Sequence, residues 1–128
     1  MSDDEVSLEH QHAFVMAFIL AARRERYSSQ LNSEKKRPRF LDRLNHRLLD
    51  DIDDRYIIAK PRFHDPQKAV SCYIIADQTQ FDGKLVSPEV AQAFLDSATF
   101  GIVVSFLPGR LAAYKDESPS EIIWLERP

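Results

Sequence analysis

The chain has 128 residues, 44% of them hydrophobic, and a formal net charge of −3 at pH 7. This length and apolar content fit one globular domain with its own core and argue against a second domain. A single cysteine, Cys72, excludes an intramolecular disulfide framework and a multi-cysteine zinc site, and it suits a reducing cytosol. The start is acidic, and the longest apolar run, residues 13–22, is too short to span a bilayer. We therefore expect a cytoplasmic protein without a membrane segment.

The charges are unevenly distributed along the chain. Residues 1–22 carry four acids and no Lys or Arg, whereas residues 23–47 carry nine bases and three acids. Residues 48–55 are acidic again. The basic block at residues 23–47 is therefore the segment that would attract a polyanion, and acidic segments flank it on both sides.

Two helices are predicted in the N-terminal half, about residues 7–54. The first covers about residues 7–30, and its middle, residues 12–22, is apolar around its whole circumference, as in a helix buried between layers. The second begins near Ser33 or Arg37. Its apolar residues recur at helical spacing and face one side, with charged residues opposite: Phe40, Leu41, Leu44, Leu48 and Ile52.

The C-terminal half, about residues 56–127, is predicted to form an antiparallel or mixed sheet. Ser87 and Pro88 have the residue types of a helix N-cap and first turn, so a third helix is expected at about 88–97. β-Branched and aromatic runs predict four strands, at residues 70–76, 100–107, 111–115 and 122–125, and residues 56–59 are a candidate for a further short strand. The fold class is therefore α+β, with about four strands, three helices and a C-terminal three-strand meander in one domain.

The order of strand 70–76, helix 88–97 and strand 100–107 leaves two topologies open. A right-handed crossover would make these two strands parallel neighbours. The alternative is a helix that merely bridges two antiparallel strands.

The pairing of the last three strands predicts that both faces of the sheet are apolar. The turn at residues 107–110 pairs Val103 with Tyr114, with some splay or a bulge near the turn. A second turn at 116–120 brings Tyr114 opposite Ile122, and a slip of one residue there would exchange Trp124 with its neighbours. One face then carries Val103, Leu107, Ala112, Tyr114, Ile122 and Trp124, and the other carries Ile102, Val104, Phe106, Leu111, Ala113, Ile123 and Leu125.

Each of the two apolar faces of the sheet must pack against another structural element or another molecule. The first helix would give a three-layer monomer, whereas the same face of a second copy would give a two-fold dimer. We favour the homodimer, because a helix that is apolar on every side needs more neighbours than this short chain easily supplies. The residues expected at its interface are Val103, Tyr114, Ile122 and Trp124.

Two groups of residues are candidates for binding an anion. The first is the proline-bounded loop at 60–66, where Lys60, Arg62 and His64, together with Arg110, could meet a phosphate or carboxylate. The second is the basic block, which would contact nucleic acid if its charges gather on one face. Its candidate residues are Arg37, Arg39, Arg43 and Arg47.

No metal site or cofactor is predicted. His10 and His12, with Glu9, lack an identifiable third ligand and are interpreted as surface residues near the helix start. Residues 50–54 carry four aspartates but lack the glycine and distal glutamate of a calcium loop, so they are interpreted as a solvated acidic helix end. Cys72 alternates with apolar neighbours and is expected in the core.

The sequence carries no specific catalytic signature. The leading hypothesis is a small cytosolic, non-catalytic interaction domain that acts through self-association or a protein partner. The alternative is a nucleic-acid-associated protein that uses residues 23–47. A third is an enzyme whose site is assembled from separate segments, with His46, His64 and Arg110 as its residues.

Overall fold

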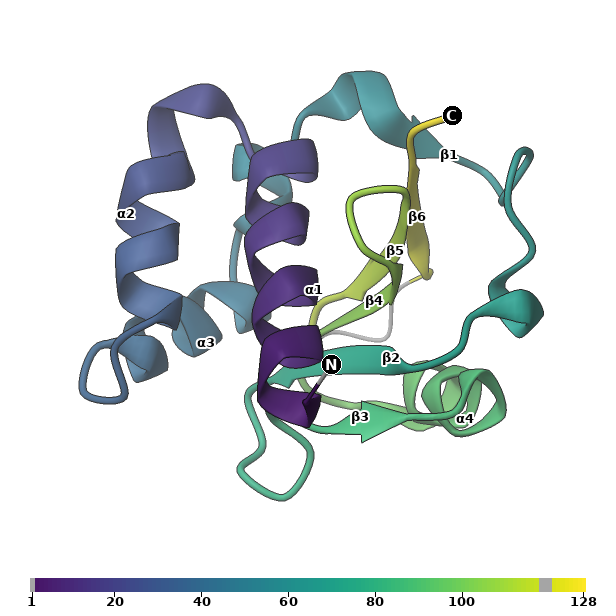
Figure 1. The fold of residues 1–128 in the computed structure, drawn as a ribbon. Coiled ribbons are helices and arrows are strands. Elements are labelled where there is room, and N and C mark those ends of the chain that lie inside the picture. Colours follow the sequence, from purple (N-terminus) through teal and green to yellow (C-terminus); the bar gives the residue numbers. More distant parts are fainter. Residues whose placement is uncertain (1, 118–120) are drawn as a thin grey trace.

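The computed structural model describes residues 2–117 and 121–128, and these residues form four α-helices and one six-stranded sheet (Figure 1). The α+β class is thereby confirmed. The helices are α1 (Asp3–Phe18), α2 (Ala21–Leu31), α3 (Arg37–Asn45) and α4 (Pro88–Ser97). The strands are β1 (Ile57–Ile58), β2 (Cys72–Ala76), β3 (Leu85–Val86), β4 (Ile102–Leu107), β5 (Leu111–Lys115) and β6 (Ile123–Glu126). Within the described ranges, no helix is both long and apolar enough to cross a membrane.

The strands are ordered β1-β6-β5-β4-β2-β3, and each neighbouring pair is antiparallel. Of the two topologies left open for β2 and β4, the antiparallel one is confirmed and the parallel crossover is excluded. β3 pairs with β2 and carries the chain back to the Cys72 end of β2. α4 then returns it to the Ala76 end, where Ile102 begins β4 opposite Ala76.

Helices cover both faces of the sheet (Figure 1). α1 and α3 pack on one face, α2 packs against these two helices, and α4 packs on the other face. The first core contains Tyr73, Ile75, Val103, Ala112, Tyr114 and Leu125 of the sheet. The second contains Cys72, Ile74, Ala76, Ile102, Val104, Phe106, Leu111 and Ala113. One chain thus buries two apolar sheet faces, which removes the argument that led to the homodimer.

The predicted register of the meander is confirmed in its first hairpin and wrong in its second. Val103 pairs with Tyr114, and the register shifts between Ser105 and Leu107. Tyr114 pairs with Ile123, one residue beyond the predicted partner, so Trp124 lies on the α4 face. There its ring stacks obliquely on Phe106, with centroids 5.5 Å apart. Positions 118–120 of the predicted turn lie outside the described residues.

The four residues predicted for a dimer interface do not form one surface. Val103 and Tyr114 are buried beneath the helices of the first core, with 0% and 1% of their surface exposed. Ile122 and Trp124 are half-buried and pack against the other core. The error follows from the one-residue slip, because side chains alternate between the faces of a strand.

The predicted first helix is interrupted at Ile19 and Leu20, which both have extended backbone. Ile19 forms a β-bridge with Ile52, and the Leu20 amide donates to the Asp51 carbonyl at 2.8 Å. This pairing with a distant segment overrides the local helical preference. The apolar circumference is also not fully buried, since Met16 and Leu20 are exposed.

α3 begins where Pro38 predicted but ends at Asn45, before the expected limit at Ile52. Its last turn lies directly on the sheet: the Tyr114 hydroxyl donates to the Leu44 carbonyl at 2.6 Å, and the Gly101 amide donates to Asn45 Oδ1 at 2.7 Å. Arg47, which follows, has left-handed backbone with a φ of 69°. α3 is thus fixed to the sheet at its C-terminal end.

Candidate anion-binding groove

A cavity with a volume of about 630 Å³ lies between α2 and α3. Volumes of this size are usual for ligand sites. Its α2 residues are spaced three and four apart, so that α2 presents one polar face to it. The lining residues are Arg23, Arg26, Tyr27, Ser29, Gln30, Lys36, Arg39, Asp42 and Arg43. Five are cationic and one is acidic, which makes the groove electropositive.

The buried carboxylate of Asp51 holds part of the lining in place. It accepts hydrogen bonds from the Tyr27 hydroxyl and from Arg43, whose Nε and Nη2 lie 3.1 and 2.9 Å from Oδ2. Arg23 Nε lies 3.5 Å from the other oxygen. Burial alone would raise the pKa of Asp51, but the bonds from Tyr27 and Arg43 outweigh it and lower that pKa. Asp51 therefore remains charged and fixes Arg43 at the wall of the groove.

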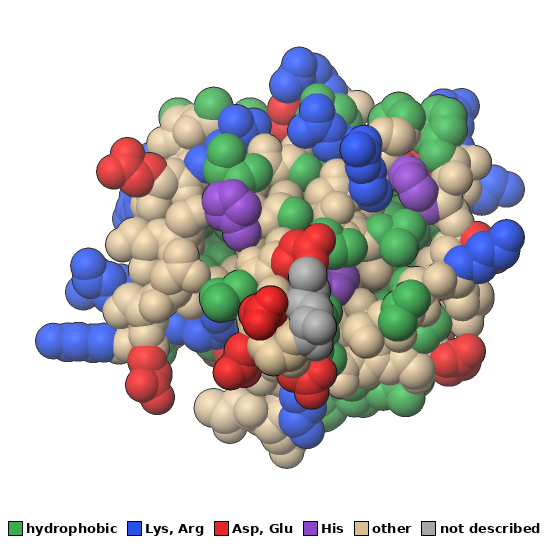
Figure 2. Space-filling view, in the orientation of Figure 1, with side chains coloured by type: hydrophobic (Ala, Val, Ile, Leu, Met, Phe, Trp, Pro, Cys, Tyr) green, Lys and Arg blue, Asp and Glu red, His purple; other side chains and the backbone are tan. Residues whose placement is uncertain are grey.

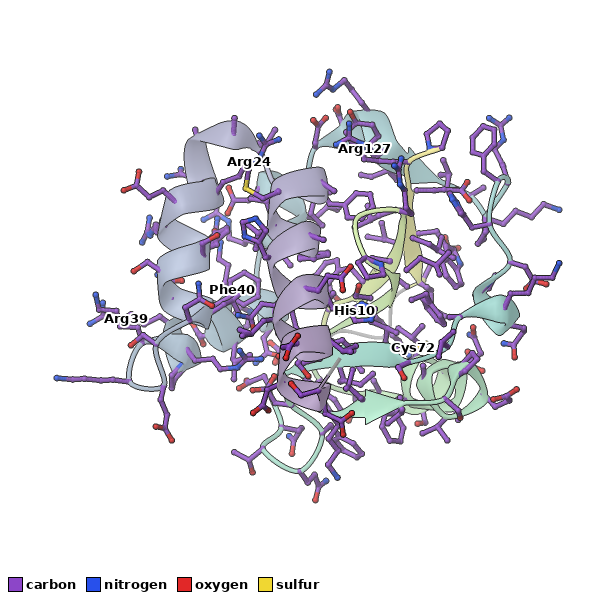
Figure 3. The ribbon with its side chains drawn as sticks, in the orientation of Figure 1. His10, Arg24, Arg39, Phe40, Cys72 and Arg127 are labelled. Carbon is purple, nitrogen blue, oxygen red and sulfur yellow. The ribbon has the colours of Figure 1, made fainter. Side chains whose placement is uncertain are left out.

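Three further cations of the groove have no ion-pair partner among the described residues. Among the described residues, no acidic side chain forms an ion pair with Arg26, Lys36 or Arg39. Figure 3 shows Arg39 extending from the helical side of the molecule, while its neighbour Phe40 points into the core. These side chains can turn toward an anion without first breaking an ion pair.

Gln30 adds an unsatisfied acceptor to the same groove. It is 8% exposed, and its Oε1 is buried without a hydrogen-bond partner in the described structure. Buried polar atoms rarely lack a partner. A donor that enters the groove and reaches this amide would satisfy it.

Two of the four arginines predicted for nucleic-acid contact lie elsewhere. Arg37 is mostly buried and binds the Asp82 carboxylate through Nε and Nη2, at 2.7 and 2.9 Å. It also donates to Gln11, to Tyr73 and to the Leu31 carbonyl. The exposed Arg47 pairs with Asp50 at 3.3 Å. Of the four, only Arg39 and Arg43 line the groove.

The backbone of the loop at residues 60–66, which was predicted to bind an anion, is built around a carboxylate of this chain. Glu126 is 4% exposed and accepts the backbone amides of Arg62, Phe63 and His64 at 2.8, 2.9 and 2.9 Å. His64 Nδ1 lies 3.2 Å from the same carboxylate. Burial would raise the pKa of Glu126, but these four contacts outweigh it and lower that pKa. Glu126 was not predicted, although strand alternation with Trp124 places it on a buried face.

The three residues proposed for an assembled enzyme site do not converge. His46 lies beyond the C-terminal end of α3 and pairs with Glu117 at 3.2 Å. That end contacts Gly101, before the start of β4. His64 contacts Glu126, and Arg110 donates to the Pro128 carbonyl, both near the opposite end of β4. The structure thus separates His46 from the other two.

Three of the candidate metal residues are buried: His10, Asp51 and Asp53. Asp51 and Asp53 are buried and bind arginines, so the prediction of a solvated helix end is wrong for these two. His10 is buried rather than at the surface. Within residues 2–117 and 121–128, no three His, Cys, Asp or Glu side chains are grouped to hold a metal ion.

Cys72 lies in the core, as predicted. It is 0% exposed and belongs to the cluster beside α4. Figure 3 shows it at the start of β2, close to α4. Burial raises the pKa of its thiol to about 12. A buried protonated thiol is a poor nucleophile, so Cys72 is a structural residue.

His10 forms a buried polar link between α1 and the sheet. Its Nδ1 lies 2.7 Å from the Ser105 hydroxyl, and its ring stacks on Tyr73 with centroids 6.2 Å apart. Burial lowers the pKa of His10, while the Ser71 backbone and the charge of Glu9 act in the opposite direction. His10 precedes Phe14 by four residues, which is the sequence signal that places it on the buried side.

Acidification should therefore destabilise the protein through His10. Below about pH 6.5 the unfolded chain binds a proton at His10 that the folded chain does not bind until a lower pH. The free energy of unfolding should fall there, by up to about 1.4 kcal/mol per pH unit. Urea denaturation from pH 7 to pH 5 measures the slope, which His10→Asn should reduce. Exposed His12 provides the control: an equal loss of slope in His12→Asn would contradict the assignment.

The chain was compared with known protein families, with curated proteins and with solved structures, and it matches none of them.

Proposed function

We propose that this chain is a non-catalytic binding domain and that its groove between α2 and α3 holds a phosphate-bearing polyanion. The observation that carries the proposal is the group of five cations around a cavity of about 630 Å³, three of them without an ion pair to a described residue. Single-stranded nucleic acid is the polyanion that we would test first.

The electrostatics favour a ligand with several negative charges. Asp42 and Asp51 offset part of the positive charge, but Arg26, Lys36 and Arg39 have no acidic partner among the described residues. Arginine binds phosphate oxygens through two parallel N–H groups, and lysine binds them as a point charge. Three such side chains along one groove suit successive phosphates of a chain better than one isolated anion.

Binding is favoured over catalysis because the groove lacks a candidate nucleophile with an adjacent base. Ser29 lines it, but the described lining contains no histidine, and Asp42 is its one carboxylate. The pair that has the chemistry of a nucleophile and a base, Ser105 and His10, is buried between α1 and the sheet. Catalysis at the groove would require groups that its described walls do not supply.

The test is binding of a fluorescently labelled single-stranded oligonucleotide, measured by anisotropy as a function of salt. We expect binding at low salt that weakens steeply as salt rises, because phosphate contacts release counterions. Arg26→Glu combined with Arg39→Glu should weaken binding by at least about tenfold. Loss of two phosphate contacts should also reduce the log–log salt slope by about 1.4.

Lys84→Glu is the matched control, because Lys84 is exposed beside β3 and lies outside the groove. It should leave the salt slope close to that of the unchanged protein. Arg37 is left intact, because its replacement would damage the fold. Binding that is absent at low salt, or lost equally in Lys84→Glu, would contradict the proposal.

A further inference from the structure

The loop between β1 and β2 presents an apolar side chain to solvent from a fixed backbone. Phe63 is 64% exposed, although its amide and those of Arg62 and His64 all donate to the buried Glu126 carboxylate. Loops that a rigid scaffold holds in place often carry binding residues. The loop is thus preorganised, so binding of a partner would not include the entropy cost of ordering the loop.

Cations surround this aromatic side chain. Lys60, Arg62 and Lys68 are exposed, and none forms an ion pair with a described residue. The one acid between them, Asp65, caps the following 3₁₀ helix by accepting the Gln67 amide at 2.9 Å. Figure 2 shows Lys and Arg side chains next to hydrophobic ones on this side of the molecule, at the right of the view.

The surface beside the loop is hollowed in two places that meet at Leu107. The lining of the first hollow, about 470 Å³, has two cations and one acid; its residues are Arg62, Phe63, His64, Asp65, Lys68 and Leu107. The second, about 320 Å³, is mainly apolar and is lined by Val70, Phe106, Leu107 and Pro108. Val70 is 92% exposed at its rim. Two neighbouring hollows that share Leu107 and differ in their lining suit an extended chain better than a compact molecule.

We propose that this surface, named here the Phe63 groove, docks an acidic peptide segment of a protein partner. Carboxylates of the segment would lie over Arg62 and Lys68, and an apolar side chain would enter the second hollow beside Val70 and Leu107. Glu9 also lines the second hollow and would repel a carboxylate there, so the acidic residues of the segment would lie at the first hollow. A concave groove with separate polar and apolar parts favours a peptide over a flat bilayer. This site is distinct from the groove between α2 and α3.

The test is selection of peptides from a phage-displayed random library on the protein of residues 1–128. We expect the selected peptides to combine acidic residues with one large apolar residue. Phe63→Ser should weaken their binding at least about tenfold, as truncating a central aromatic contact does. The substitution leaves the backbone amide of residue 63 available to Glu126, so the loop should keep its conformation. Val90→Ser, which alters an exposed apolar residue on α4, is the control and should bind normally.

Charge reversal gives a second readout that does not depend on Phe63. Arg62→Glu with Lys68→Glu should abolish binding of the acidic peptides and select basic ones instead, while the Arg26→Glu/Arg39→Glu protein should still bind the acidic peptides. Failure to select any peptide, or peptides that bind the Phe63→Ser protein unchanged, would overturn the proposal. Binding of phosphatidylserine vesicles through Phe63, without acidic peptides, would overturn it in favour of a membrane surface.

Discussion

Replacing Arg37 by methionine is expected to lower the free energy of unfolding by about 3 kcal/mol. The change would leave the Asp82 carboxylate, whose side chain is 14% exposed, without its cation. It would also remove the donors that Arg37 supplies to Gln11, Tyr73 and the Leu31 carbonyl. Removing one partner of a buried pair costs far more than losing an exposed one, because the remaining charge stays desolvated.

Arg39→Met is the matched control, because Arg39 is the same residue type on the same helix but is exposed and unpaired with any described acid. It should change the free energy of unfolding by less than about 0.5 kcal/mol. Urea denaturation at neutral pH measures both variants. In the double variant Arg37→Met/Asp82→Asn, part of the lost stability should return, because no unpaired charge remains. Equal effects of Arg37→Met and Arg39→Met would show that the Arg37 network does not stabilise the fold.

Local signals predicted those elements whose ends are set by neighbouring residues. Ser87 accepts the Val90 amide and Pro88 opens α4, as their residue types indicated. The break after Phe18 has no such signal, because it depends on pairing with residues 51–53 across the fold. The slip in the last hairpin arose in the same way: a turn of uncertain length sets which face each later side chain takes.

The candidate sites likewise divide into features set by neighbouring residues and features set by contacts across the fold. The basic block was predicted from the sequence, but Arg37 and Arg39 were given the same role. In the structure Arg37 is mostly buried and pairs with Asp82, whereas Arg39 lines the groove. Helical spacing distinguishes the two residues: Arg37 precedes Phe40 by three residues and Leu41 by four, so it lies on the same helix face as the apolar stripe. Glu126 depends on amides more than sixty residues away, so its role could be seen only in the folded chain.

Gly101→Ala should destabilise the protein by about 3 kcal/mol or more, since overpacking of this kind costs roughly 1–3 kcal/mol when neighbours can move. A Cβ at Gly101 would lie 2.4 and 2.6 Å from the Leu44 carbonyl carbon and oxygen, and 2.7 Å from the Asn45 amide nitrogen. These are backbone atoms in the last turn of α3, so no side-chain rotation can relieve the clash. Relief would require α3 to move away from β4.

Such a movement would break the bonds that fix α3 to the sheet. The Gly101 amide donates to Asn45 Oδ1 at 2.7 Å, and the Tyr114 hydroxyl donates to the Leu44 carbonyl at 2.6 Å. Gly83→Ala is an informative control: nothing lies within 4 Å of the added carbon, but φ is +79°, so it should cost only about 1–2 kcal/mol from backbone strain. Thermal and urea unfolding compare the two variants. A Gly101→Ala protein as stable as Gly83→Ala would mean that α3 can shift freely, and that the close backbone contact does not define the position of the α2–α3 groove.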